Sequence, residues 1–311
     1  MTPTVAAPGR GPVAERWRSA ARSSPKRVVL ADGNDERAAA AARVLDAEGL
    51  AVPVLVHDAA SSRSSAVGAM AEASPWRDRI DLDDPLHVAA LMVAAGEADA
   101  CVAGATRPTP DVVRAALFCV GTAPGVDIVS SCFVFVLPDG TPITYGDCGV
   151  VPEPSADQLA SIAIASAATH AQLSGDEPRV AMLSYSTKGS AEGPGVELVR
   201  TATGLVRSRA PGLAVDGELQ FDAAWVPEVA ATKAPGSPVA GRANVFVFPD
   251  LSAGNIAYKI TQRLAGARAF GPLLQGTAGV IHDLSRGCSV DDIVTVATIA
   301  ACQAARSSGY N

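Results

Sequence analysis

The sequence predicts an α/β protein with mainly parallel sheets. Short runs rich in β-branched residues, such as 27–31 and 52–56, alternate with alanine-rich helical stretches, such as 36–48. This β-α-β order places a helical crossover between strands and so favours a parallel sheet covered by helices. The apolar content is 48% but the aromatic content only 5%, so small aliphatic side chains must fill the core.

The elements follow one another in this order along the whole chain. The pattern predicts strands at 100–103, 128–137, 143–145, 180–184, 215–219, 244–248 and 269–274, and helices at 86–96, 111–120, 156–173, 193–207 and 289–305. A hairpin is expected at 138–141, where Pro-Asp-Gly-Thr separates two strands. Residues 58–76 are rich in Ser and Ala without a clear period, and are expected to form a loop or a reduced subdomain.

Composition excludes several classes of function. The formal net charge is −7 and the pI is about 5.1, so the chain lacks the basic footprint of a nucleic-acid-binding protein. No apolar run reaches membrane-spanning length. We therefore expect neither nucleic acid nor membrane as a partner.

The cysteines and histidines indicate neither disulfides nor a metal site. Six cysteines show no C-x-x-C pair, and four histidines are scattered without metal-ligand spacing. We expect buried thiols in a reducing compartment, hence a cytoplasmic protein, and no metal.

The first 25 residues are rich in Arg, Ala and Pro and lack an apolar core, so they are not expected to be a secretory signal. A frayed tail leading into a surface helix around 13–22 is expected, and a transit peptide is the alternative.

The segment 283–294 is the most informative part of the chain. It places Ser285, Arg286 and Asp292 within eight residues at the start of an apolar helix. A hydroxyl, a guanidinium and a carboxylate suit the transfer of an acyl group away from phosphate. The guanidinium fits phosphate oxygens, and the helix N-terminus also favours an anion. The hydroxyl can donate a hydrogen bond to a developing oxyanion. The alternative, which spacing alone favours, is that Ser285 and Arg286 belong to an ordinary loop without a functional role.

Asp292 has two interpretations. Ser289-x-x-Asp292 matches a capping box, so Asp292 can be a structural cap of the helix. It can also accept the proton of an attacking thiol, because the thiolate is the nucleophile, and partial desolvation would raise its pKa towards that task. One residue can serve both roles. Cys288 in the same loop is expected to be a buried structural thiol.

Two further strand-to-helix turns are candidate anion sites. One contains Ser186, Thr187, Lys188 and Gly189, which can form a nest for phosphate, or an ordinary loop. The other precedes a helix that carries Arg114, whose alternative role is a surface or interdomain salt bridge.

Many segments resemble the phosphotransacetylases (phosphate acetyl- and butyryltransferases). Besides the final motif they include 29–37, 98–105, 122–126, 146–148, 180–184, 216–224, 233–237, 253–256 and 262–267. The matches occur in order over most of the chain. The resemblance implies two α/β domains with mainly parallel sheets and an interdomain cleft, an isocitrate/isopropylmalate dehydrogenase-like architecture, usually as a homodimer. The expected domains are 1–125 plus 276–311, and 126–275.

The implied activity is reversible acetyl transfer between acetyl phosphate and coenzyme A. The expected partners are small molecules (coenzyme A, acetyl phosphate and phosphate), with coenzyme A as a substrate and no permanently bound cofactor. In this mechanism Asp292 takes the thiol proton, Ser285 steadies the tetrahedral oxygen, and Arg286 with Arg114 holds phosphate. Asn255 joins the 186–189 loop as a substrate-binding residue. Direct attack in a ternary complex needs no acyl-enzyme.

Two alternatives remain: butyryl rather than acetyl specificity, and a catalytically silent acetyl-CoA-binding module. The second is kept open by one departure from the family pattern. The basic Arg-Lys-x-Lys-Gly segment usual before Asp84-Pro85-Leu86 is replaced here by a short Ser/Ala stretch. A dehydrogenase is disfavoured because no G-x-G-x-x-G loop follows a strand.

Overall fold

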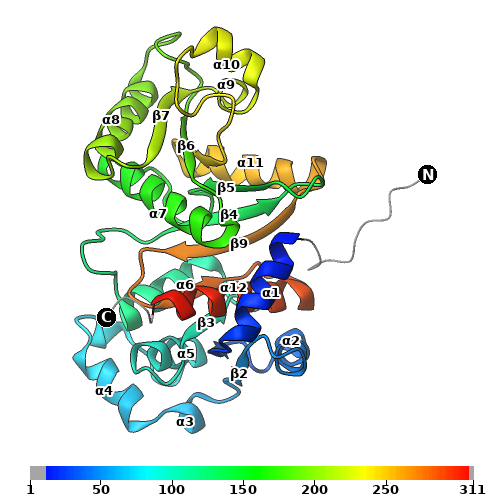
Figure 1. The fold of residues 1–311 in the computed structure, drawn as a ribbon. Coiled ribbons are helices and arrows are strands. Elements are labelled where there is room, and N and C mark those ends of the chain that lie inside the picture. Colours follow the sequence, from blue (N-terminus) through cyan, green and yellow to red (C-terminus); the bar gives the residue numbers. More distant parts are fainter. Residues whose placement is uncertain (1–11, 308–311) are drawn as a thin grey trace. The chain divides into compact units, whose positions relative to one another are not determined.

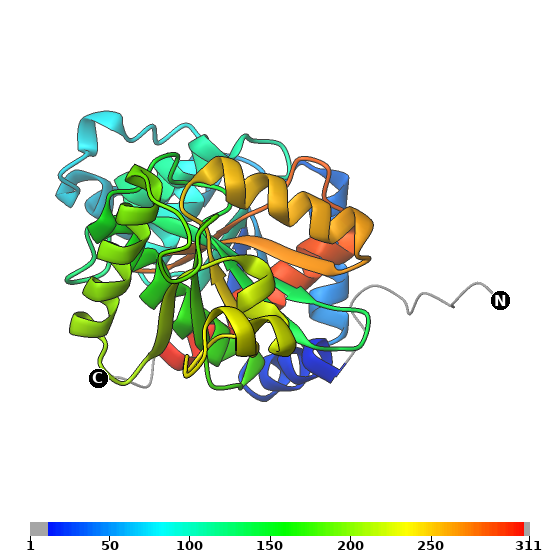
Figure 2. The ribbon, with the colours of Figure 1, turned by 90° about the horizontal axis from the view of Figure 1, so that it is seen from above.

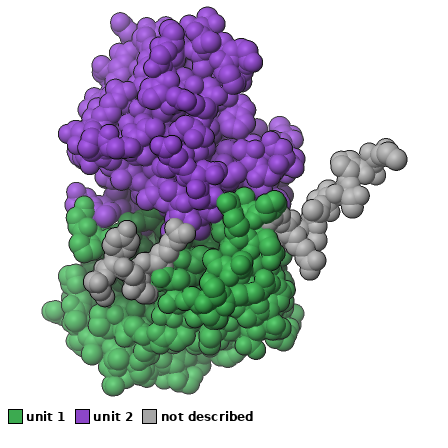
Figure 3. Space-filling view, in the orientation of Figure 1, with its two compact units in different colours: residues 1–125, 270–311 green, residues 126–269 purple. Residues whose placement is uncertain are grey.

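The computed structural model describes residues 12–307, and these form two compact units. Unit 1 consists of Met1–Gly125 and Phe270–Asn311, and unit 2 consists of Val126–Ala269 (Figure 3). Both units alternate strands and helices (Figure 1), which confirms the prediction of an α/β chain.

Unit 1 contains a sheet in the order β2-β1-β3-β10-β9. The strands β2, β1, β3 and β10 run parallel to one another, and β9 is antiparallel to β10. The bounds are β1 Arg27–Leu30, β2 Val52–Leu55, β3 Ala100–Ala103, β9 Arg268–Gln275 and β10 Val280–Asp283. Because four neighbouring strands run the same way, their carboxyl ends meet at one edge of the sheet.

Helices pack around this sheet in two groups. The helices α2 and α12 pack on each other and α1 packs on α12, while α5 packs with α4 and with the π-helical turn that continues α6. Their bounds are α1 Pro12–Ser23, α2 Glu36–Ala47, α3 Ala59–Ser62, α4 Ser65–Ala73, α5 Pro85–Ala94, α6 Thr109–Ala115, the π turn Ala116–Val120 and α12 Val290–Ser307. The expected surface helix is α1, but its Trp17 is buried and packs edge-on against Phe270. Residues 1–11 of the predicted tail lie outside the described part of the chain.

Unit 2 contains a sheet in the order β4-β5-β8-β6-β7, in which only the β4–β5 hairpin pairs antiparallel. The strands are β4 Ser130–Val136, β5 Pro142–Gly146, β6 Arg179–Leu183, β7 Ala214–Leu219 and β8 Val245–Val247. The helices are α7 Ala156–Ser174, α8 Pro194–Arg209, α9 Phe221–Trp225, α10 Pro227–Lys233 and α11 Leu251–Leu264 (Figure 2).

The β8 strand shows how the two faces of this sheet are filled. Val245 and Val247 join an aliphatic cluster under α7 and α8, whereas Phe246 joins an aromatic cluster on the other face. This alternation follows from the two-residue period of a strand. On the aromatic face, Phe133 stacks on Tyr258 of α11 at 4.3 Å between ring centroids.

Three local predictions are wrong or incomplete. Of the two possibilities for residues 58–76, a loop is wrong: the segment holds α3 and α4, and Ser64 caps α4 by accepting a hydrogen bond from the backbone nitrogen of Val67. The strand β10 was not predicted, because its His282 and Asp283 are polar although both are buried. The helices α9, α10 and α11 were also missed.

Candidate active-site loop in unit 1

The carboxyl edge of the unit 1 sheet brings three loops together. Asp32 follows β1, and its carboxylate accepts hydrogen bonds from the backbone nitrogens of Ala105 (3.0 Å) and Thr106 (3.1 Å), which follow β3. The end of β10 and the loop after it approach Gly104 so closely that a Cβ there would lie 2.2 Å from Oδ1 of Asp283 and 2.8 Å from the carbonyl oxygen of Leu284. Such an edge is where open α/β sheets bind ligands.

The loop after β10 presents Ser285 and Arg286 to solvent. The backbone nitrogen of Cys288 donates to the carbonyl of Ser285 at 2.9 Å, and that of Gly287 donates to Ser285 Oγ at 3.3 Å. Both Ser285 and Arg286 are exposed. Among residues 12–307, nothing forms a hydrogen bond or an ion pair with the Arg286 guanidinium, so its charge is available to an anion.

Asp292 forms the capping box that its spacing predicts. Its Oδ2 accepts hydrogen bonds from the backbone nitrogen and the hydroxyl of Ser289, both at 2.8 Å, and its own nitrogen donates to Ser289 Oγ at 3.2 Å. No described residue donates to its other oxygen, Oδ1. The side chain is exposed rather than partly desolvated as expected. One oxygen therefore caps α12 and the other is free to accept a proton.

Arg37 connects the three loops, and sequence reasoning gave it no role. It bonds to Asp35 after β1, to the carbonyl of Ala105 after β3 (2.8 Å), and to the carbonyls of Arg286 and Cys288 after β10 (2.9 Å each). Its hydrogen bonds to Asp35 hold the pKa of that carboxyl below its ordinary value. The only signal in the sequence was its place in the run Asp35-Glu36-Arg37, which is part of the family resemblance.

Asp283 is a second residue that sequence reasoning did not single out. It is fully buried at the end of β10, with Oδ2 accepting a hydrogen bond from Thr109 Oγ1 and Oδ1 without a partner among the described residues. Burial raises its pKa to about 7. Asp283 thus carries a carboxyl that is easily protonated, two residues before Ser285.

Cys288 lies in the same loop but is not poised as a nucleophile. Its side chain is buried, and burial raises the pKa of the thiol to about 11 although Arg37 opposes this shift. The thiol therefore stays protonated at neutral pH, as the structural interpretation of this cysteine expects.

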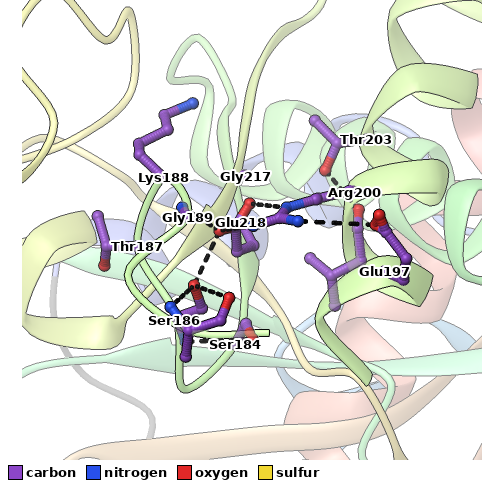
Figure 4. Close-up of polar contacts among 12 residues, drawn as sticks. Ser184, Ser186, Thr187, Lys188, Gly189, Glu197, Arg200, Thr203, Gly217 and Glu218 are labelled. Carbon is purple, nitrogen blue, oxygen red and sulfur yellow. Dashed lines mark hydrogen bonds and ion pairs between the residues drawn. The ribbon is translucent and has the colours of Figure 1, made fainter. Parts of the chain in front are cut away.

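The 186–189 loop follows β6 in unit 2 and surrounds a buried carboxylate (Figure 4). Glu218 Oε1 accepts hydrogen bonds from Ser186 Oγ (2.9 Å) and the backbone nitrogen of Gly189 (2.7 Å), and Arg200 Nε donates to its Oε2 at 3.0 Å. Burial raises the pKa of Glu218, but these hydrogen bonds outweigh it and lower the pKa to about 2. Glu218 is therefore ionised and occupies the donors expected to hold a phosphate.

The other groups of this loop also have partners in unit 2. Lys188 Nζ forms an ion pair with Asp216, which also pairs with Arg207 at 2.7 Å, and Thr187 Oγ1 donates to Gln220. A substrate role for these residues stays a prediction, in which a phosphate would compete with protein carboxylates or bind to the outer face of Lys188.

Arg114 and Asn255 are the remaining predicted binding residues. Arg114 stands in the last turn of α6 and forms an ion pair with Asp111 one turn earlier, while its side chain stays 56% exposed. Asn255 lies on α11 in unit 2, where its amide nitrogen donates to the carbonyl of Cys148 at 3.1 Å. Their substrate roles stay predictions.

Over residues 12–307, no group of three or more His, Cys, Asp or Glu side chains is arranged to hold a metal ion. In the same range no helix is both long enough and apolar enough to span a membrane.

The fold, the loop after β10 and the first turn of α12 together define an α/β protein in which an exposed hydroxyl, a guanidinium and a carboxylate lie near one edge of a sheet. Residues 13–77 and 76–301 match the family described as phosphate acetyl/butaryl transferase. The chain belongs to this family.

Relatives and solved structures agree with this assignment. The chain is 46% identical to a phosphate acetyltransferase of Acetivibrio thermocellus, over 91% of this chain and 96% of that protein. It is also 46% identical to one from Paracoccus denitrificans, over 93% of this chain and 98% of the relative. A phosphotransacetylase from Streptococcus pyogenes has a similar structure, with a TM-score of 0.88 at 38% identity over 94% of this chain and 98% of that one.

Proposed function

We propose that this protein is a phosphate acetyltransferase, which transfers an acetyl group reversibly between coenzyme A and phosphate. One observation supports this most directly. In a chain of this family, the loop after β10 carries an exposed hydroxyl and a guanidinium without a partner among residues 12–307, and the first turn of α12 carries a carboxylate with one unpartnered oxygen. These are the three groups that acyl transfer from acetyl phosphate to a thiol requires.

In the proposed mechanism, Asp292 Oδ1 accepts the proton of the coenzyme A thiol while Oδ2 keeps its bonds to Ser289. The thiolate attacks the acetyl carbon, and Ser285 Oγ donates a hydrogen bond to the carbonyl oxygen as it becomes negative. The carbon–sulfur bond forms and the bond between acetyl carbon and phosphate oxygen breaks. Arg286, with Arg114, holds the departing phosphate by charge-assisted hydrogen bonds. Asp292 then returns its proton to phosphate or solvent.

The test is a thioester absorbance assay with coenzyme A and acetyl phosphate, applied to Asp292→Asn. The Asn side chain keeps an oxygen that can cap α12 but cannot take the proton, so turnover should fall at least about 100-fold with little change in unfolding temperature. The control Ser64→Ala removes the cap of α4, where Ser64 accepts from Val67 at 3.1 Å. It should cost about 1 kcal/mol of stability and leave turnover unchanged.

Near-wild-type turnover of Asp292→Asn would remove the proton-acceptor role and leave only the cap. Wild-type protein that forms no thioester from acetyl, propionyl or butyryl phosphate, yet binds acetyl-CoA by calorimetry, would instead indicate the silent binding module. Comparing kcat/KM for the three acyl phosphates shows how long an acyl chain the pocket accepts, because each methylene in a hydrophobic pocket contributes roughly 1–3 kcal/mol to transition-state binding.

We also propose a cytoplasmic homodimer. Ile256, Ile260 and Leu264 stand at four-residue intervals on α11 and are 59%, 52% and 83% exposed, which makes one apolar face suited to a second copy. No disulfide joins any of the six cysteines, all of which lie within residues 12–307, and this supports a reducing compartment. Ile260→Glu should convert a dimer, measured by light scattering, into a monomer. A wild-type monomer would exclude the dimer proposal.

A further inference from the structure

We propose that Arg37 is a positioning residue for the acetyl transfer, because it holds the loop that carries Ser285 and Arg286 against the sheet edge. The inference rests on the proposed function and adds a residue to its machinery. Arg37 itself is not expected to touch the substrate.

The guanidinium of Arg37 uses every N–H it has. A guanidinium carries five donors in a planar fork. Nε and one Nη2 hydrogen go to the two oxygens of Asp35 (3.0 and 2.8 Å), and the other Nη2 hydrogen goes to the carbonyl of Ala105 (2.8 Å). Both Nη1 hydrogens go to carbonyls of the catalytic loop, those of Arg286 and Cys288 (2.9 Å each). The side chain is therefore fixed in one orientation.

The catalytic loop, residues 285–288, depends on Arg37 for its attachment to the rest of unit 1. Its other hydrogen bonds are internal, from Cys288 and Gly287 to Ser285. Among residues 12–307, Arg37 supplies the hydrogen bonds that join positions 285–288 to chain outside 285–293. The carbonyls it holds belong to Arg286 and to the residue two positions later, so fixing them fixes the direction in which Ser285 and Arg286 project.

The hydrogen bonds of Arg37 also neutralise its charge, which leaves Arg286 as the cation available to phosphate. The carboxylate of Asp35 lies 2.8 Å from Nη2 of Arg37 and neutralises it. The backbone carbonyls that complete the fork carry no net charge. Arg37 can therefore anchor the loop without adding a second free cation that would compete with Arg286 for phosphate.

A lysine cannot replace this residue. Its ammonium has three donors at one point and cannot reach carbonyls on two loops together with both oxygens of Asp35. Arg37→Lys should therefore lose activity almost as fully as Arg37→Ala, which a role in net charge alone would not predict.

The experiment compares Arg37→Ala and Arg37→Lys with the matched control Arg27→Ala. Arg27 also pairs with an aspartate, Asp99 (3.1 Å), and with a backbone carbonyl, that of Gly96 (2.8 Å), but it stands at the first residue of β1, at the opposite edge of the sheet. All three variants should lose a similar amount of thermal stability. Only the Arg37 variants should lose kcat, by about 100-fold, the effect expected of a misplaced catalytic group.

Chemical rescue separates positioning from a general loss of structure. The Arg37 side chain is 32% exposed, so guanidinium ions from solvent can enter the space that alanine leaves. Millimolar guanidinium should restore at least about tenfold of kcat to Arg37→Ala, and equimolar ammonium should not. The inference would be overturned if Arg37→Ala turned over as fast as Arg27→Ala. It would also be overturned if guanidinium and ammonium restored the kcat of Arg37→Ala equally.

Hydrogen exchange distinguishes failure of this inference from failure of the proposed function. The backbone amides of 285–289 should exchange faster in Arg37→Ala than in the wild type. In Arg27→Ala their exchange rates should equal those of the wild type. If the wild type transfers no acyl group, the proposed function fails whatever the exchange shows. If the wild type is active but exchange in this loop is unchanged by Arg37→Ala, the positioning role fails alone.

Discussion

Replacing Asp283 by Asn should make the protein more stable at alkaline pH and have a smaller effect at acidic pH. The buried carboxyl has a pKa of about 7 instead of the ordinary 3.8, because burial disfavours its charged form. The folded state then binds a proton more tightly than the unfolded state. Stability from this group is fully present below pH 3.8 and is lost as pH rises through about 7.

The size of the effect follows from the shift. One pH unit corresponds to about 1.4 kcal/mol, so the whole shift corresponds to about 4 kcal/mol. Between pH 5.5 and 8 the unfolded carboxyl is ionised throughout while the folded one loses its proton. The wild type should therefore lose about 2 kcal/mol over this interval that Asp283→Asn does not lose. The Asn oxygen can still accept the hydrogen bond that Thr109 donates to Asp283.

The assay is urea unfolding of both proteins at pH 5.5, 6.5 and 8, followed by circular dichroism, with m-values compared first. The free energy of unfolding of Asp283→Asn minus that of the wild type should rise by about 2 kcal/mol across the range. The control is Asp78→Asn, since Asp78 is 93% exposed and its replacement should have the same effect at each pH. A difference that stays flat for Asp283→Asn would show that Asp283 is already ionised at pH 5.5 in the folded protein.

Three further predictions concern other buried groups. Glu218→Gln should lower the free energy of unfolding by about 3 kcal/mol at pH 7, because the lowered pKa of Glu218, about 2, gives stability above pH 4.5 that is lost as pH falls through 2. Urea unfolding should show a smaller loss of stability at pH 3 than at pH 7. An equal loss at both pH values would contradict an electrostatic origin. Gly104 and Gly49 both have positive φ (103° and 63°), but only at Gly104 would a Cβ clash with a neighbour, lying 2.2 Å from Asp283 Oδ1. Gly104→Ala should therefore lower the free energy of unfolding by at least about 2 kcal/mol more than Gly49→Ala. Equal losses of stability would mean that the end of β10 and the loop after it move aside without cost. The Cys288 thiol, with its pKa of about 11, should react slowly with iodoacetamide at pH 7.5, and Cys288→Ala should keep turnover within about threefold of wild type; a large loss would restore Cys288 as a chemical participant.

Strands and helices whose buried positions are all apolar could be predicted from the sequence. The strand predicted at 100–103 has these bounds in the structure, because Asp99 and Gly104 delimit an uninterrupted run of four apolar side chains, all of them buried. In contrast, β10 ends in His282 and Asp283, which are buried although they are polar. A pattern of polar and apolar residues cannot show that Thr109 and Gln303 provide hydrogen bonds to these side chains.

The predicted site shows the same limit. The capping box of Ser289 and Asp292 could be predicted because its partners are three residues apart. The contacts of Arg37 could not, since they join it to carbonyls 249 and 251 residues later, and a backbone carbonyl has no sequence signature. The occupation of the 186–189 loop by Glu218 was hidden for a related reason. A loop of small and cationic residues binds an external phosphate or an internal carboxylate by the same donors.

The two interpretations of Asp292 are compatible because a carboxylate has two oxygens. If the cap used both, the proton acceptor would have to break the helix start to act, and if it used neither, the side chain would be free to rotate away from the thiol. Ser289 holds Oδ2 alone, through its nitrogen and its hydroxyl. The cap therefore orients Oδ1 at the N-terminus of α12, where Arg37 holds the neighbouring loop. Removing the Ser289 hydroxyl should consequently weaken catalysis as well as the helix, and the loss of kcat should exceed the loss expected from unfolding alone.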